Sequence, residues 1–269
     1  MDDDPSSIPV LFDAFRAELD DHNDRRERLI KASRDVTIAS KRVIFLLHRI
    51  INENTADYAV LATRAAAEAS KKLREIQGLF KAMAPELAGD RFWHYQPNVS
   101  PGLQEYIEAL SFAHYLEHRS LITYAAVQRS LSDDVGGPYF PLPVSDYLLG
   151  LSDLTGELMR FAISAIAKRG GRSKASEVCA FVRGCKADFE IFTPHIRDLA
   201  KKQRVTSQSL QKIEEAAYAI AVRTSEYDLP PDLLDDLVSR HVSGYRPDEG
   251  DERRGAGRKR HHESDDEGY

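Results

Sequence analysis

Residues 9–52 read PVLFDAFRAELDDHNDRRERLIKASRDVTIASKRVIFLLHRIIN and contain no Gly and, after the first residue, no Pro. Along this stretch apolar side chains recur at three- and four-residue steps, as at Leu11, Phe15 and Leu19. That spacing places them on one face of a helix. A helical pattern of this length is typical of a bundle or coiled-coil helix, so the stretch predicts a fold of long helices.

The rest of the chain repeats this pattern between breaks at Gly and Pro. A short aromatic segment at residues 91–95 is predicted to end at Pro97, and Ser100-Pro101 to open the next helix. The predicted helices span residues 56–84, 100–118, 120–131, 144–167, 174–191, 206–224 (with a lead-in from 195) and 230–241. The predicted fold class is all-α, a single bundle of about seven helices with long antiparallel helices.

Three regions are predicted along the chain. Residues 1–8 form a disordered acidic N-terminus, residues 9–243 a helical domain, and residues 244–269 a disordered charged tail with almost no apolar side chains. The basic cluster within residues 253–260 of this tail is interpreted either as a nuclear-localisation signal or as a solvated stretch. No apolar run approaches the ~20 residues that a membrane-spanning helix needs, so no membrane association is expected.

The formal net charge of −6 limits how the chain could bind nucleic acid. Bulk positive charge is excluded as the source of attraction to phosphates. A local basic patch, a basic partner or bound cations would have to supply it.

Two predicted helices carry acidic side chains at close spacing. Glu105 and Glu108 lie three residues apart on the first, and Asp153 and Glu157 four apart on the second. Side chains at these spacings are neighbours on a helix surface, and like charges there repel. If the two helices face each other, four carboxylates converge, and such a cluster needs a cation to neutralise it. Mg²⁺ prefers oxygen ligands of this kind, but the same spacings are also common on ordinary solvated helices.

Four segments carry a more specific signal: SKRVIFLLHRI (40–50), GLQEYIEA (102–109), VSDYLLGLSDLTGELMR (144–160) and KIEEAAYAI (212–220). In sequence and order they resemble the translin family, and within it translin-associated factor X. The resemblance covers roughly residues 10 to 240 and implies a translin-like fold. The sister protein translin lacks the acid set, so Glu105, Glu108 and Asp153 place this chain with factor X.

The resemblance implies a function as well as a fold. It implies an Mg²⁺-dependent endoribonuclease subunit, with Mn²⁺ as a substitute metal, that cleaves single-stranded RNA in a hetero-oligomer with translin. Glu105, Glu108 and Asp153 would be the metal-binding catalytic acids, and Glu157, one turn further on, is added to both roles. The implied processes are passenger-strand removal in RNA silencing and transfer-RNA fragment processing, with cytoplasmic and nuclear residence.

Local basic residues could hold the nucleic acid, which would be RNA or, as a further candidate, single-stranded DNA. For each of them a solvated or salt-bridged side chain is the alternative. The candidates are Lys41, Arg42, His48, Arg49, Arg119 and Arg160.

Two rival interpretations of the sequence differ in the function that they assign. The stretch from His114 to His118 fits the His-x-x-Glu-His pattern of inverted zinc peptidases, but no third-ligand segment accompanies it. The serious rival is a non-catalytic scaffold that binds nucleic acid with translin. The acid set separates the two functions, because a scaffold has no need of converging carboxylates.

Overall fold

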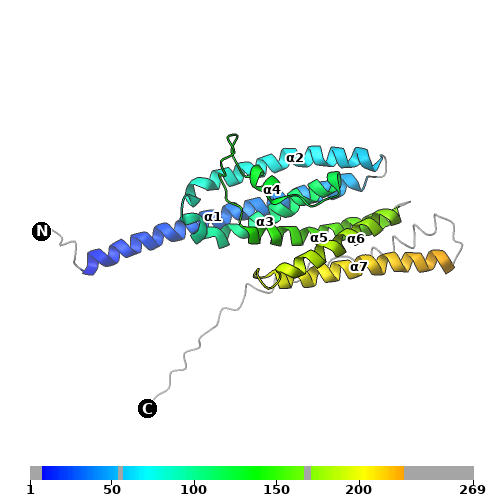
Figure 1. Ribbon diagram of the computed structural model, residues 1–269. Coiled ribbons are helices and arrows are strands. Elements are labelled where there is room, and N and C mark those ends of the chain that lie inside the picture. Colours follow the sequence, from blue (N-terminus) through cyan, green and yellow to red (C-terminus); the bar gives the residue numbers. More distant parts are fainter. Residues whose placement is uncertain (1–7, 54–56, 167–170, 227–269) are drawn as a thin grey trace, which may run out of the picture.

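The computed structural model describes residues 8–53, 57–166 and 171–226 (Figure 1). Within these ranges all regular elements are helices, apart from an isolated β-bridge between Ser132 and Pro138. The elements are α1 (Ile8–Ile51), α2 (Tyr58–Met83), the 3-10 helix η1 (Ala84–Leu87), α3 (Arg91–His118), α4 (Tyr124–Ser130), α5 (Val144–Ile166), α6 (Gly171–Phe192) and α7 (Leu199–Glu226). The predicted all-α fold of about seven helices is thus confirmed, and α1 has almost the predicted bounds.

The helices form two groups that meet at α3 and α5. Helix α1 packs on α2 and α3, whereas α5 packs on α6 and α7. The contact between α3 and α5 joins the groups, so these two helices run through the middle of the molecule (Figure 1). Among the described residues, no helix has an apolar stretch long enough to cross a membrane. The predicted helix at 230–241 and the predicted tail from residue 244 lie outside the described residues.

Helix α3 departs from the sequence-based expectation. Pro97 and Pro101 were predicted to end one short segment and open another, but both lie inside a single continuous helix. A proline inside a helix removes a backbone hydrogen bond. The helix is nevertheless tied to α1 beside the second proline, where the Ser33 hydroxyl accepts a hydrogen bond from the Gly102 amide (3.1 Å) and donates to the Val99 carbonyl (3.4 Å). Packing of α3 on the neighbouring helices thus outweighs the backbone hydrogen bonds lost at the prolines.

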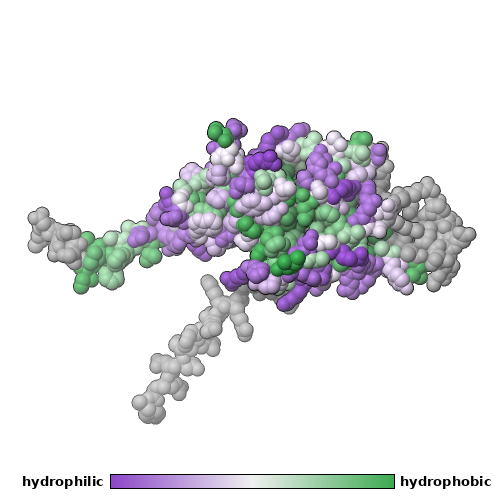
Figure 2. Space-filling model, viewed as in Figure 1, coloured by the Kyte–Doolittle hydropathy of each residue, from purple (hydrophilic) through white to green (hydrophobic). Residues whose placement is uncertain are grey.

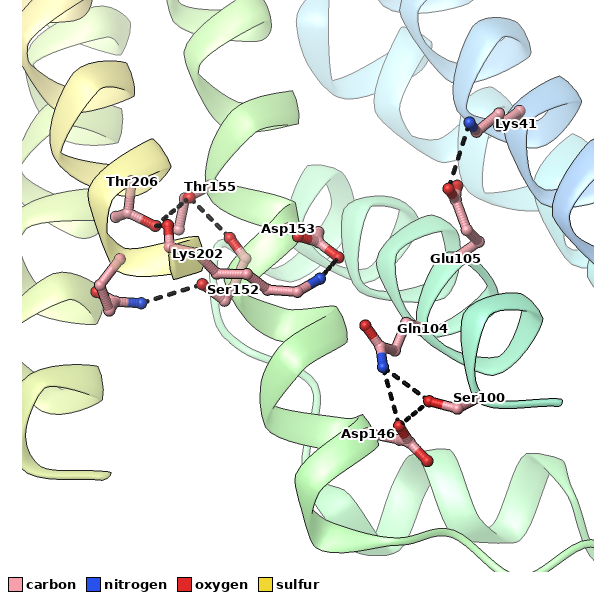
Figure 3. Close-up of polar contacts among 11 residues, drawn as sticks. Lys41, Ser100, Gln104, Glu105, Asp146, Ser152, Asp153, Thr155, Lys202 and Thr206 are labelled. Carbon is pink, nitrogen blue, oxygen red and sulfur yellow. Dashed lines mark hydrogen bonds and ion pairs between the residues drawn. The ribbon is translucent and has the colours of Figure 1, made fainter. Parts of the chain in front are cut away.

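The crossing of α3 and α5 is unusually close at Gly150. A Cβ atom built on Gly150 would lie 2.7 Å from the Cβ of Ile107 and 2.9 Å from the carbonyl oxygen of Gln104. One turn earlier on α5, the buried carboxylate of Asp146 accepts hydrogen bonds from three side chains of α3, two of which, Ser100 and Gln104, appear in Figure 3. The donors are Gln96 (2.7 Å), Ser100 (2.5 Å) and Gln104 (2.9 Å). A missing side chain and a buried polar latch together fix how α3 and α5 face each other.

The N-terminal end of α1 projects beyond the rest of the molecule (Figure 1). It carries exposed apolar side chains at helical spacing, and Figure 2 shows them as an apolar surface on the projecting end. The exposed fraction is 67% for Phe12, 56% for Phe15 and 60% for Leu19. From Leu29 onward the same helix buries a residue every three or four positions. Both parts of α1 thus carry apolar side chains at helical spacing, but only those of the second part are buried by other described helices.

Replacing Gly150 by Ala should push α3 and α5 apart. Because the new methyl group meets the backbone of α3 and the stiff β-branched side chain of Ile107, we expect a loss of about 1–3 kcal/mol in the free energy of unfolding. Gly78→Ala in α2 is the matched control, since a Cβ there meets nothing within 4 Å. Alanine at this exposed helical position should stabilise the chain by about 0.5–1 kcal/mol. Urea denaturation measures the free energy of unfolding of both variants. If both substitutions changed it by the same amount, the close crossing of α3 and α5 would be contradicted.

Candidate active site

An open cavity of about 610 Å³ lies where four helices approach one another. Helices α3 and α5 supply the acidic side chains, and α1 and α7 flank them with basic and apolar ones. The cavity is lined by Lys41, Ile44, Phe45, Glu105, Glu108, Ser152, Asp153, Thr155, Gly156, Glu157, Arg160, Lys202 and Val205. All four acids predicted from the sequence therefore lie around one space, as expected if the two helices face each other.

Two of the acids are paired with lysines from opposite sides of the cavity (Figure 3). Lys41 of α1 lies 3.4 Å from a carboxylate oxygen of Glu105. Lys202 of α7 makes an ion pair and a hydrogen bond with Asp153. Burial raises the pKa of both carboxyl groups, and in each case the lysine opposes that rise. The lysines therefore favour the ionised form of acids that burial would otherwise neutralise.

Glu108 lies between these pairs and has no hydrogen bond or ion pair with any described residue. Its pKa is raised well above the ordinary value, first by burial and then by the charges of Asp153, Glu157 and Glu105. A carboxyl group in these surroundings binds a proton, or another cation, more readily than a solvated one. Glu108 is thus the point at which the cluster lacks compensating charge.

Glu157 is held on both sides. The Nε2 atom of His48 lies 2.7 Å from one carboxylate oxygen, and Arg160 lies 3.1 Å from the other. The imidazole of His48 also packs against the ring of Phe112, with 4.7 Å between the ring centroids. These contacts fix the orientation of Glu157 and leave it less free than Glu108.

The acids share a cavity but do not converge on one point. In the described part of the chain, no group of three His, Cys, Asp or Glu side chains is arranged to hold a metal ion. Glu105 is paired with Lys41 of α1 and Asp153 with Lys202 of α7, so each of these two carboxylates has a lysine partner of its own (Figure 3). The donor set itself suits a hard divalent cation, because it offers carboxylate oxygens and the Glu108 group has no partner. Binding of such an ion would require the acids to turn away from their lysines.

The predicted basic contacts fall into separate places. Lys41 and Arg160 line the cavity, whereas Arg42 and Arg49 lie exposed elsewhere on α1. Arg119 is at the end of α3, where its guanidinium packs over the ring of Tyr58 at 4.4 Å from the centroid. Arg119 is therefore not among the residues that line the cavity, and its guanidinium packs on aromatic rings instead of being solvated or salt-bridged.

Lys202 is the cavity residue that sequence reasoning missed. Its part of the chain was predicted only as a helical lead-in, and a lysine there carries no signal of its own. Lys202 lies at the cavity because α7 packs on α5, and two hydrogen bonds join these helices close to it. Thr206 and Thr155 share a hydrogen bond of 3.0 Å, and Gln203 donates to the hydroxyl of Ser152 at 3.0 Å.

The fold and the cavity together define an all-helical protein with a cluster of acids between two central helices. Residues 24–224 match the Translin family, and the chain belongs to this family. It is 38% identical over 256 residues to Translin-associated protein X of Rattus norvegicus, an alignment that covers 87% of this chain and 85% of that relative. Translin of Gallus gallus is 22% identical over 218 residues, covering 81% and 93% of the two chains.

A solved structure agrees with the family assignment. The crystal structure of apo-NeC3PO superposes with a TM-score of 0.59 at 20% identity, covering 78% of this chain and 96% of that chain. At this identity the likeness shows the fold. Both the predicted translin-like fold and the predicted resemblance to translin-associated X are confirmed.

Glu108→Gln should stabilise the chain in the absence of divalent cations. The raised pKa means that the folded chain holds this proton more tightly than the unfolded chain, so stability falls as the pH rises through the folded value. Removing the charge should raise the melting temperature by about 2–4 °C near pH 8, the shift expected for about 1 kcal/mol in a domain of this size. The gain should shrink as the pH is lowered through the raised pKa of the folded wild-type carboxyl group, because that group then takes up its proton and loses its charge.

Glu75→Gln is the control for this comparison, because Glu75 is exposed on α2. This control should leave the melting temperature unchanged at each pH. Thermal melts followed by circular dichroism at several pH values measure the effect. A gain that does not depend on pH, or a loss of stability near pH 8, would show that Glu108 is not an uncompensated acid.

Proposed function

We propose that this chain is the catalytic subunit of a magnesium-dependent endoribonuclease that cleaves single-stranded RNA in a complex with translin. The observation that carries the proposal is the cavity in which Glu105, Glu108 and Asp153 come together from α3 and α5. Burial and mutual repulsion raise the pKa of Glu108, which favours cation binding at this place. The similarity to translin-associated protein X supports the same assignment.

The roles of the side chains follow from their contacts. Glu105, Glu108 and Asp153 would hold Mg²⁺, for which Mn²⁺ could substitute. The bound ion would supply a lowered pKa for water and a counter-charge for the phosphodiester. Glu157 would orient the site, since His48 and Arg160 already bind both of its oxygens.

Contacts to RNA are assigned to the basic residues at the cavity. Lys41 and Arg160 lie on its wall beside the acids, where a phosphate group could meet them. With a net charge of −6, the chain as a whole would repel RNA, so a partner has to contribute attraction. We infer that translin is this partner, as the name of the rat relative, Translin-associated protein X, suggests.

The projecting end of α1 supports a partner on physical grounds. Phe12, Phe15 and Leu19 form an exposed apolar stripe at the spacing of a helix that packs on another protein surface. Assembly would cover it, which fits a subunit rather than an isolated enzyme. Passenger-strand removal, transfer-RNA fragment processing and cytoplasmic and nuclear residence belong to the same proposal and rest on the family resemblance.

Cleavage of a labelled single-stranded RNA by the complex of this chain with translin tests the proposal. The wild-type complex should cut only when Mg²⁺ or Mn²⁺ is present. The Glu108→Gln complex should assemble equally well and lose at least about 100-fold in rate, because it lacks the charge that binds the ion.

Glu75→Gln again serves as the matched control and should cut at the wild-type rate, since its side chain lies on the exposed face of α2. Size-exclusion chromatography verifies that each variant assembles. If the assembled wild type does not cut, or cuts no faster than Glu108→Gln, the chain acts as a non-catalytic nucleic-acid-binding scaffold of translin and the chemistry lies elsewhere.

A further inference from the structure

Lys202 is placed so that its charge acts on the whole acid cluster. Its ammonium group pairs with Asp153, and its side chain lines the cavity. It lowers the pKa of Glu105, Glu108 and Asp153 alike, against the burial that raises all three. Lys41, in comparison, acts on Glu105 from the other wall. Lys202 therefore occupies the electrostatic position that a bound cation would take.

The helix that carries Lys202 is held in place by buried polar contacts. Thr206, one turn further along α7, is bonded to Thr155, and Gln203 is bonded to Ser152. All four of these side chains are buried. The backbone of α7 is thus fixed against α5, while the flexible lysine stem, with 23% of its side chain exposed, retains room to move into the open cavity.

We propose that Lys202 is a built-in counter-ion of the acid cluster, which a divalent cation must displace in order to bind, and which therefore sets the metal affinity of the site. The inference rests on the proposed function and adds a residue to it. It explains how acids from α3 and α5 can share a cavity while no ion is bound. It also accounts for the pairing of Asp153 with Lys202 in place of a metal ion (Figure 3).

The physical consequence is a competition between two cations. A divalent ion that enters the cluster gains the attraction of several carboxylates, but it has to break the ion pair between Lys202 and Asp153 and accept the repulsion of a nearby positive charge. Removing the lysine charge eliminates both costs. Metal affinity should then rise, even though a positively charged residue has been lost from a cavity proposed to bind RNA.

The experiment is an Mn²⁺ titration of the complex with translin, in which electron paramagnetic resonance measures the free ion. Lys202→Met should bind Mn²⁺ about tenfold more tightly than the wild type, a ratio that corresponds to about 1.4 kcal/mol. Lys202→Arg keeps the charge and should stay within about twofold of the wild type. Lys201→Met is the matched control with the same change of net charge, because Lys201 is the exposed neighbour and lies outside the cavity.

A Glu108→Gln complex shows which Mn²⁺ ions bind at the acid cluster. This variant should lose the Mn²⁺ site whose affinity the lysine variants change. If the wild type binds Mn²⁺ at this site and Lys202→Met binds no more tightly than Lys201→Met, the counter-ion proposal is wrong and the proposed function stands. If no Mn²⁺ binding depends on Glu108, the proposed metal site fails and the inference fails with it.

The stability of Lys202→Met gives a second, independent readout. Without its counter-ion the acid cluster repels itself, so the variant should melt at a lower temperature than Lys201→Met in metal-free buffer. Saturating Mn²⁺ should abolish this difference in melting temperature. A variant that folds only with the metal would support the proposal in the same way, whereas one that melts like Lys201→Met in metal-free buffer would contradict it.

Discussion

The close approach of α3 and α5 is the constraint on which the rest of the structure depends. It requires that position 150 carry no side chain, because a Cβ there would overlap Ile107. It is also fixed by Asp146, whose buried carboxylate is saturated by hydrogen bonds from α3. With the two helices locked in this way, Glu105 and Glu108 have to face Asp153 and Glu157. The cavity is therefore a consequence of helix packing rather than of a dedicated loop.

This arrangement concentrates negative charge, and the surrounding helices compensate for most of it. Helix α1 contributes Lys41 and His48, and α7 contributes Lys202. The compensation is incomplete at Glu108, which has no partner among the described residues and whose pKa is raised accordingly. Structural ion pairs generally complete their pairing, since an unpaired buried charge is costly. The unpaired Glu108 therefore supports the proposal that this cluster binds a cation.

The sequence predicted the acid helices well because the information is local. Residues three and four apart on a helix are neighbours whatever the fold, so Glu105 with Glu108 and Asp153 with Glu157 could be recognised from spacing. The long α1 followed from periodicity for the same reason. What spacing cannot give is the identity of the facing helix. Lys202 is 49 residues away from Asp153 along the chain, and only the packing of α7 on α5 brings them together.

Two further differences have the same origin. The break predicted at Pro97 did not occur, because the packing of α3 on α1, α2 and α5 outweighs the backbone hydrogen bonds lost at the two prolines. No separate role was predicted for Asp146, and only the structure shows that its carboxylate accepts hydrogen bonds from α3 and so connects α5 to α3. In both cases a contact between distant segments decides the role of a residue, and periodicity within one helix carries no information about such contacts.

The most direct test of the account is the position of a bound metal. Crystals of the complex with translin, grown with Mn²⁺, should give an anomalous-scattering peak beside Glu108, with Asp153 turned from Lys202 towards the ion. That result would establish the acid cluster as the metal centre and Lys202 as the cation it replaces. Absence of a peak at Glu108 in a well-ordered crystal that holds Mn²⁺ elsewhere, with Asp153 still paired to Lys202, would contradict the central claim.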